Sequence, residues 1–262
     1  MIVEKIVKTN QNSLIVWKWY FIIVRMEHVE FLKKIVLEAA SLITDDFEVN
    51  SKGDSYDVVT NFDYAVEKYL IEKMNEHYPT FTVVSEEFNT TSEQTDNCFI
   101  IDPIDGTINF ANKIPLWGIQ VACKKDGKTC AAVIYLVKQN ELFWADETGA
   151  YLNGEKISVR KYKHIKNAIY TLNGNKADIV HQKIKNQAFS RRILGACCVC
   201  YAYVACGRLS GEFFGNNSAW DYEPGMYIAK QAGAYIIDRK DTHIAACTEE
   251  FAKLMDLESD FN

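Results

Sequence analysis

The first clear pattern in the chain is a helical one that begins after Glu27. Apolar residues recur there every three or four positions, at Val29, Leu32, Val36, Ala39 and Ile43, with charged residues between them. This period predicts an amphipathic helix. After a polar stretch, Thr60 and Asn61 are typical N-cap residues for a second helix, which ends before Pro79. That helix would bury Val66, Leu70 and Met74.

The middle of the chain consists of short apolar runs that are typical of strands. They lie at Phe81–Ser85, Cys98–Asp102, Gly118–Cys123, Cys130–Val137 and Glu141–Ala145. The last third alternates again, with strands expected at Ala168–Leu172 and Ala234–Asp238 and helices at Cys197–Cys206 and Trp220–Ala232. The pattern therefore indicates a mixed α/β (α+β) fold with a β-rich middle.

The N-terminal segment, residues 1–25, does not fit this pattern. The run Leu14–Val24 is apolar but is interrupted by Lys18, and it is too short to span a bilayer as a helix. It has no small-residue cleavage site before Arg25, so it does not match a signal peptide. We interpret residues 1–25 as a dispensable N-terminal extension, because Met26 begins a segment that would make sense as its own start.

Composition and charge narrow the class of ligand. The 262 residues are 48% apolar and 24% charged, as in a folded globular protein. The formal net charge is −6 and no basic stripe is present, so we expect neither nucleic acid nor membrane as a partner. An acidic protein can still bind an anionic phosphate ester if metal ions supply the local positive charge.

The cysteines carry no metal or disulfide signature. All eight lie mostly in apolar stretches, at positions 98, 123, 130, 197, 198, 200, 206 and 247. We expect them to be reduced core residues of a cytoplasmic protein. Zinc at Cys197, Cys198 and Cys200 is disfavoured, because a tetrahedral site needs four well-spaced ligands.

Acidic residues follow or open several of the apolar elements. They are Asp57 in DVVT, Glu86 and Glu87 in VSEE, Asp102 and Asp105 in IIDPIDGT, and Asp221 in WD. Any one of them alone is better explained as a turn or cap residue. Together they indicate a site, since carboxylates at buried strand ends are costly unless something positive joins them.

The string IIDPIDGT shows how such a site could form. Pro103 keeps Asp102 extended, and the turn that follows can bring Asp105 back beside it. Gly106 and Thr107 then open a short helix, whose free N–H groups form an anion site next to the carboxylates. All-oxygen ligands suit Mg²⁺ better than zinc or copper.

Four strings make the chain similar to a known family. FIIDPIDGTINF, VSEEF, DVVTNFD and AWD occur in the order and at the separations of the inositol monophosphatase family, and the likeness runs from about Glu27 to near the C-terminus. The resemblance implies the layered αβαβα sandwich of the inositol monophosphatase and fructose-1,6-bisphosphatase type. It also implies a homodimer, inhibition by lithium, and metals in the cleft between two halves, residues 26–160 and 161–262, the second supplying Asp221 and the substrate pocket.

The same resemblance assigns roles to the acidic residues. Two or three Mg²⁺ ions would be held by Glu86, Asp102, Asp105, Asp221 and the backbone carbonyl of Ile104. Glu87 would help to hold a further metal and its water, and Asp57 and Thr107 would orient the attacking water. Asp105, Asp221 and the N–H groups of Gly106 and Thr107 would contact the phosphate.

The substrate pocket is where the sequence departs from the family. Inositol-specific members carry Glu seven residues before the aspartate of WD, and here that position is Phe214, with Glu212 two positions away. Cys197 stands where a small Ala is common. The resemblance thus implies a phosphatase of a small phosphomonoester such as inositol 1-phosphate. The alternatives are a nucleotide 3′-phosphate, fructose 1,6-bisphosphate, histidinol phosphate or NADP as substrate, or a regulatory homologue without turnover.

Overall fold

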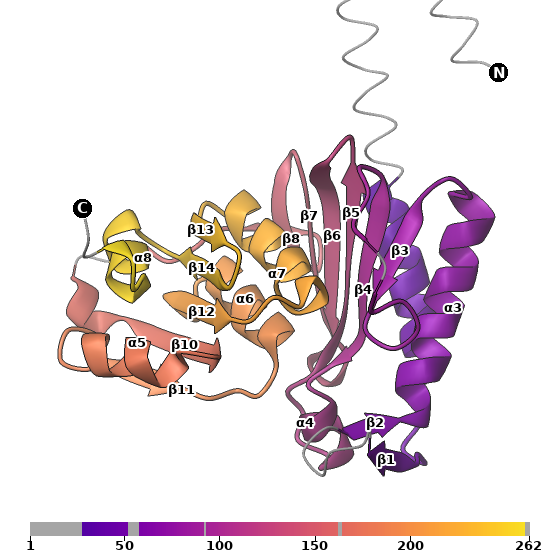
Figure 1. The fold of residues 1–262 in the computed structure, drawn as a ribbon, viewed down its shortest axis with the longest axis horizontal. Helices are drawn as coiled ribbons and strands as arrows, with labels where there is room; N and C mark the ends of the chain where they lie inside the picture. The colour runs from indigo at the N-terminus through magenta and orange to yellow at the C-terminus, as the bar shows by residue number, and fades with distance from the viewer. Residues whose placement is uncertain (1–27, 52–57, 92, 162–163, 260–262) are drawn as a thin grey trace, which may run out of the picture.

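The computed structural model describes residues 28–51, 58–91, 93–161 and 164–259 (Figure 1). The predicted extension, residues 1–25, and Asp57 lie outside these ranges. Residues 28–40 are helical, as the apolar spacing predicted. A short antiparallel pair of strands follows, β1 (Val49–Ser51) and β2 (Val58–Thr60), and β2 leads directly into helix α3 (Asn61–His77).

Helix α3 (Asn61–His77) begins where the sequence predicted it. The Thr60 hydroxyl caps it by accepting from the N–H of Phe62, and the Asp63 carboxylate accepts from the N–H of Thr60 at 2.7 Å. This reciprocal arrangement is a capping box. It orders the chain directly before the helix and buries the Asp63 side chain.

Seven strands form the larger sheet, in the order β3-β4-β5-β6-β7-β8-β9. Only β3 and β4 pair in parallel, and the remaining neighbours are antiparallel. The strands are β3 (Thr82–Ser85), β4 (Cys98–Asp105), β5 (Gly118–Lys125), β6 (Lys128–Leu136), β7 (Glu141–Asp146), β8 (Gly149–Leu152) and β9 (Glu155–Ile157). The short helix α4 (Thr107–Ala111) follows β4, and the 3₁₀ turn η1 (Val137–Gln139) follows β6.

The second sheet has five strands in the order β11-β10-β12-β14-β13. They are β10 (Ile169–Gly174), β11 (Ser190–Arg192), β12 (Gly211–Gly215), β13 (Tyr235–Arg239) and β14 (Thr242–Ala246). A 3₁₀ turn, η2 (Ile165–Asn167), leads into the sheet. Its helices are α5 (Ala177–Ile184), α6 (Cys197–Ala205), α7 (Ala219–Gln231) and α8 (Glu249–Met255).

The elements stack in five layers, which confirms the predicted αβαβα sandwich (Figure 1). Helix 28–40 and α3 cover one face of the larger sheet through an apolar cluster that includes Leu32, Leu70 and Phe99. Helices α6 and α7 fill the space between the two sheets. Helices α5 and α8 cover the outer face of the smaller sheet.

The two middle helices approach each other very closely. A Cβ placed on Gly225 of α7 would lie 2.5 Å from the Cβ of Tyr201 in α6, so only glycine allows this separation. The Tyr201 ring is fully buried, and its hydroxyl donates to the carbonyl of His243 at 3.0 Å. Helices α6 and α7 therefore pack tightly against each other between the two sheets.

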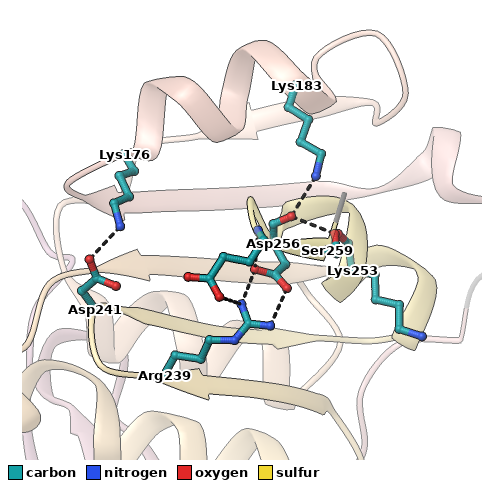
Figure 2. A network of polar contacts seen from close by, with 8 residues as sticks. Lys176, Lys183, Arg239, Asp241, Lys253, Asp256 and Ser259 are labelled. Atoms are coloured by element: carbon teal, nitrogen blue, oxygen red, sulfur yellow. Dashed lines mark hydrogen bonds and ion pairs between the residues drawn. The ribbon is translucent and has the colours of Figure 1, made fainter. Parts of the chain in front are cut away.

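A polar network fixes the end of the chain on the smaller sheet (Figure 2). Arg239 of β13 donates to both carboxylate oxygens of Asp256, at 2.5 and 2.9 Å. Lys183 of α5 donates to the Asp256 carbonyl at 2.8 Å, and Ser259 donates to the same oxygen. These bonds hold the segment after α8 across the ends of β13 and α5.

The remaining element predictions hold to within a few residues. The expected helices at Cys197–Cys206 and Trp220–Ala232 are α6 and α7, and all eight cysteines are free. Strand β4 is longer than expected, since it continues through Pro103 to Asp105. Within the described part of the chain, no helix has both the length and the apolar character needed to cross a membrane.

Candidate metal centre

Strand β4 delivers two carboxylates to one place. Asp102 pairs with Gln120 of β5 and Asp105 with Gly118, and the register shifts between these two positions. Residues three apart in a regular strand face opposite sides of the sheet. The irregularity at Pro103 and Ile104 removes that alternation, so both aspartates can turn toward the end of the strand.

The third carboxylate comes from the other half of the chain. Asp221 lies in the first turn of α7, where the free N–H groups and the helix dipole favour a negative charge. One oxygen each of Asp102, Asp105 and Asp221 lie within 4.8 Å of one another. The structure thus brings together three of the four carboxylates that the sequence predicted as metal ligands.

The electrostatics of this cluster are unfavourable without a cation. Burial raises the pKa of Asp102 well above its ordinary value, and the charges of Glu86, Asp105 and Asp221 raise it further. Burial also raises the pKa of Asp105, to about 6, although the N–H groups of Cys198 and Cys197 partly offset the effect. Glu86 is thus close enough to act on the cluster, although it is not one of the three mutually close carboxylates.

The donor set fits a hard divalent ion. Oδ1 of Asp102 is buried and has no hydrogen-bond partner among the described residues. Burial and four acidic neighbours all raise the pKa of Asp102. A cation would satisfy this oxygen and relieve the repulsion. Carboxylate and carbonyl oxygens are the ligands that Mg²⁺ prefers.

Asp105 is held by both halves of the protein. It accepts hydrogen bonds from the backbone N–H groups of Cys197, at 3.1 Å, and Cys198, which open α6. From the other side, Gln120 of β5 donates to Asp105 at 3.2 Å and to the carbonyl of Asp221 at 3.3 Å. Gln120 is fully buried and joins two of the carboxylate-bearing residues directly.

Thr107 has an acidic partner that the sequence did not predict. Its hydroxyl lies 3.3 Å from Oδ1 of Asp63 and 3.0 Å from the carbonyl oxygen of Ile104. Asp57, the partner predicted from the sequence, lies outside the described residues, so its role stays a prediction. Among the described residues, the carboxylate beside Thr107 is the second aspartate of DVVTNFD.

The carboxylate of Glu67, which was not predicted from the sequence, holds the VSEE segment in place. Glu67, buried on α3, accepts from the Ser85 hydroxyl at 2.5 Å and from the N–H groups of Glu87 and Phe88 at 2.9 and 2.7 Å. Glu86 and Glu87 themselves are half-buried. Asp63 and Glu67 are four residues apart and so share one helix face. That spacing, together with the T-x-x-D capping box, is the sequence signal that could have identified both.

The predicted phosphate-binding turn has the expected shape. Gly106 caps α4 with φ +93°, and a Cβ there would lie 2.9 Å from the Cβ of Ala196. Both facts require glycine. Thr107 then begins the helix, and the backbone of Ile104 is buried directly before the turn.

The side chains predicted to contact the substrate are more deeply buried than is usual for residues that line a binding pocket. Phe214 is 4% exposed, and its ring lies near Tyr222 and His243 at centroid distances of 6.2 and 6.3 Å. Glu212 is fully buried and accepts from Asn173 at 2.7 Å. Cys197 contributes its N–H to Asp105, and its side chain is 8% exposed.

Comparison with known proteins gives one consistent family. The family model described as "Inositol monophosphatase family" matches residues 20–254. A fructose-1,6-bisphosphatase/inositol-1-monophosphatase of Thermotoga maritima is 27% identical over 86% of this chain and 90% of its own. The Nus factor SuhB of Escherichia coli is 31% identical over 76% of this chain and 78% of its own. A solved structure of a Thermotoga maritima IMPase matches with a TM-score of 0.79 and 25% identity, over 87% of this chain and 96% of that one.

Proposed function

Since the chain belongs to the inositol monophosphatase family, we propose that it is a Mg²⁺-dependent phosphatase of small phosphomonoesters. The observation that carries the proposal is the close set formed by Asp102, Asp105 and Asp221. Such a cluster is costly to fold unless a cation joins it. The bound ions would lower the pKa of a water and stabilise the leaving oxygen during in-line displacement.

The residues around the cluster would hold and direct the reacting groups. Glu86 and the Ile104 carbonyl would complete the ligand set of two or three ions, and Glu87 would hold a further ion or its water. Ile104 directly precedes Asp105, the charge of Glu86 acts on Asp102, and Glu87 follows Glu86 in the chain. Glu67 would keep Glu86 and Glu87 in place through the N–H groups that it binds.

Thr107 and Asp63 would position the attacking water. The Thr107 hydroxyl proton faces Asp63 and the Ile104 carbonyl, so the lone pairs of Oγ1 remain to accept a hydrogen bond from a water. Asp63 fixes this orientation because the N–H and hydroxyl of Thr60 hold its other oxygen. The N–H groups of Gly106 and Thr107 would bind the phosphate at the start of α4.

The substrate in this proposal is a phosphomonoester whose alcohol part makes few specific contacts with the protein. Inositol 1-phosphate is the first candidate. Phe214 cannot accept a hydrogen bond, and Glu212 already binds Asn173 inside the core. An apolar wall discriminates by about 1–3 kcal/mol per group. Fructose 1,6-bisphosphate, a nucleotide 3′-phosphate, histidinol phosphate and NADP remain alternatives within this class.

We also propose a cytoplasmic homodimer. Phe189 and Ile193 flank the edge strand β11 and are 69% and 76% exposed. Large apolar side chains beside an unpaired strand edge are typical of an association surface. Sedimentation should give a dimer for the native chain and a monomer for Ile193→Asp; a native monomer would contradict this part.

The test of the activity is phosphate release across a panel of these esters, with Mg²⁺ titrated from a chelated state. We expect turnover only with Mg²⁺, inhibition by millimolar Li⁺, and no turnover in Asp102→Asn. A relative is described as a Nus factor, and a regulatory protein without turnover is the competing proposal. Absence of release from every ester would favour it, and release undiminished after chelation would refute the metal mechanism.

A further inference from the structure

Gln120 of β5 connects the two halves of the chain at the carboxylate cluster. Its amide nitrogen donates to Oδ2 of Asp105 at 3.2 Å and to the backbone carbonyl of Asp221 at 3.3 Å. An amide nitrogen carries two N–H donors, so these two contacts account for both of them. They also fix how the amide is turned, because the opposite orientation would place Oε1 against two acceptor oxygens.

The position of Gln120 in the sheet brings it beside the third carboxylate as well. Gln120 pairs directly with Asp102 of β4, and β6 pairs with the other edge of β5. Side chains opposite each other on antiparallel neighbours share one face of the sheet, with Cβ atoms about 4.5–5.5 Å apart. Gln120 is fully buried. It therefore adjoins Asp102, Asp105 and Asp221 from a central strand and not from a loop.

The hydrogen bonds on Asp105 leave one of its oxygens more available than the other. Oδ2 accepts from Gln120 and from the N–H of Cys198, and Oδ1 accepts from the N–H of Cys197 at 3.1 Å. A carboxylate oxygen accepts about two bonds, so Oδ2 is filled and Oδ1 can accept one more. Gln120 thus helps to determine which oxygen of Asp105 remains for a cation.

The oxygen of the Gln120 amide shows that packing does not explain this residue. Oε1 is buried and has no hydrogen-bond partner among the described residues. A buried acceptor without a partner is destabilising. An apolar side chain of similar length would fill the same space without this cost. The amide is explained instead by the two bonds that its nitrogen makes.

We propose that Gln120 is a positioning residue that holds Asp105 and Asp221 at the separation needed to bind Mg²⁺. This inference rests on the proposed function. The amide carries no charge, so it orders the carboxylates, whereas a lysine would neutralise part of their charge. Removal of a group that orients metal ligands typically lowers metal affinity about 10–100-fold. Gln120 should therefore act on Mg²⁺ affinity more than on the chemical step.

Two substitutions at Gln120 test this role. Gln120→Met and Gln120→Leu both remove the N–H donors, and they fill the space differently. Mg²⁺ binding is measured by calorimetry on the full chain without substrate. We expect the Kd for Mg²⁺ to rise about tenfold or more in both variants. The kcat at saturating Mg²⁺ should fall by a smaller factor, because bound ions then hold the carboxylates together.

Ile134→Met is the matched control. Ile134 is buried and lies directly opposite Gln120 on β6, but its side chain has no polar atom. A swap of similar volume repacks this layer without removing a donor. The control should therefore bind Mg²⁺ within about twofold of the native chain.

The outcomes separate this inference from the proposed function. Native Mg²⁺ affinity in the two Gln120 variants would contradict the inference alone, and so would an equal loss of affinity in Ile134→Met. If both Gln120 variants fail to fold in chelator while the control folds, Gln120 holds the fold and not the ligand pair, and the inference is wrong. A native chain that does not bind Mg²⁺ would contradict the proposed function as well.

Discussion

Oε2 of Glu67 accepts a hydrogen bond from the backbone N–H of Glu87 at 2.9 Å. The other carboxylate oxygen accepts from Ser85 and Phe88. One buried side chain on α3 thereby fixes the segment that carries two of the predicted metal-binding glutamates. The bonds offset part of the rise that burial causes in the pKa of Glu67. They also show that the carboxylate needs both oxygens as acceptors.

We expect Glu67→Gln to weaken Mg²⁺ binding more than it lowers kcat. The amide nitrogen of Gln would face an N–H or hydroxyl donor, which costs about 1–3 kcal/mol and loosens the segment. The concentration of Mg²⁺ for half-maximal activity should rise about tenfold. Glu72→Gln, at an exposed position of the same helix, is the control. An unchanged Mg²⁺ dependence would show that Glu67 does not position the ligands.

Asp63 and Asp57 can be separated by single substitutions. Asp63→Asn should lower kcat by about 10²-fold, because Thr107 loses the charged acceptor that orients its hydroxyl. It should also lower stability by about 1 kcal/mol, since the capping box is lost. Asp57→Asn should have the smaller effect on kcat. Turnover assays and thermal melts of both variants decide between them, and a larger loss of kcat in Asp57→Asn would favour the sequence-based assignment.

Asp102→Asn should abolish turnover and yet raise the melting temperature of the metal-free protein. Burial and its acidic neighbours raise the pKa of Asp102, so its charge opposes folding, and Oδ1 forfeits no hydrogen bond on substitution. A gain of about 1 kcal/mol corresponds to about 2–4 °C for a chain of this size. Asp45→Asn, at a side chain 95% exposed, is the control. A lower melting temperature in chelator would contradict the electrostatic account.

Glu212 should make stability depend on pH. Burial raises its pKa from 4.5 to about 8, and the hydrogen bond from Asn173 opposes part of the shift. The folded state then binds this proton more tightly than the unfolded chain. The resulting stability is fully present below pH 4.5 and is lost as the pH rises toward 8.

We therefore expect Glu212→Gln to lose less stability than the native protein between pH 5 and about 8.5. The amide keeps the oxygen that accepts from Asn173 and carries no charge to bury. Denaturant unfolding in chelator at both pH values measures the difference. Glu155→Gln, at an exposed position, should behave as the native protein does. If Glu212→Gln and the native chain lose the same amount of stability between the two pH values, the buried carboxyl does not titrate in this range.

Local signals were sufficient for most elements and for the carboxylate cluster on β4 and α7. Apolar spacing predicted α3, and the string IIDPIDGT placed Asp102 and Asp105 together because a turn acts over a few residues. The contact between Thr107 and Asp63 could not be predicted in this way. DVVTNFD offers an aspartate at each end, and the linear sequence does not tell that the packing of α3 beside α4 brings Asp63 to Thr107. Gln120 reaches Asp105 through strand register, which no linear pattern contains.

The substrate pocket was the least predictable part for a related reason. The sequence placed Phe214 by its distance from Asp221, and that distance does not reveal which side chains cover a strand. In the structure the ring is enclosed near Tyr222 and His243. A glutamate at this position would bury a charge, so the substitution would test folding before it tested specificity.

The contact between Gly225 and Tyr201 also bears on the geometry of the carboxylate cluster. Helix α6 presents the N–H groups that hold Asp105, and α7 carries Asp221. Because no residue larger than glycine fits at Gly225, the spacing of the two helices also sets how far Asp221 lies from the N–H groups that support Asp105. A methyl group at this position would therefore change the shape of a centre that it does not touch.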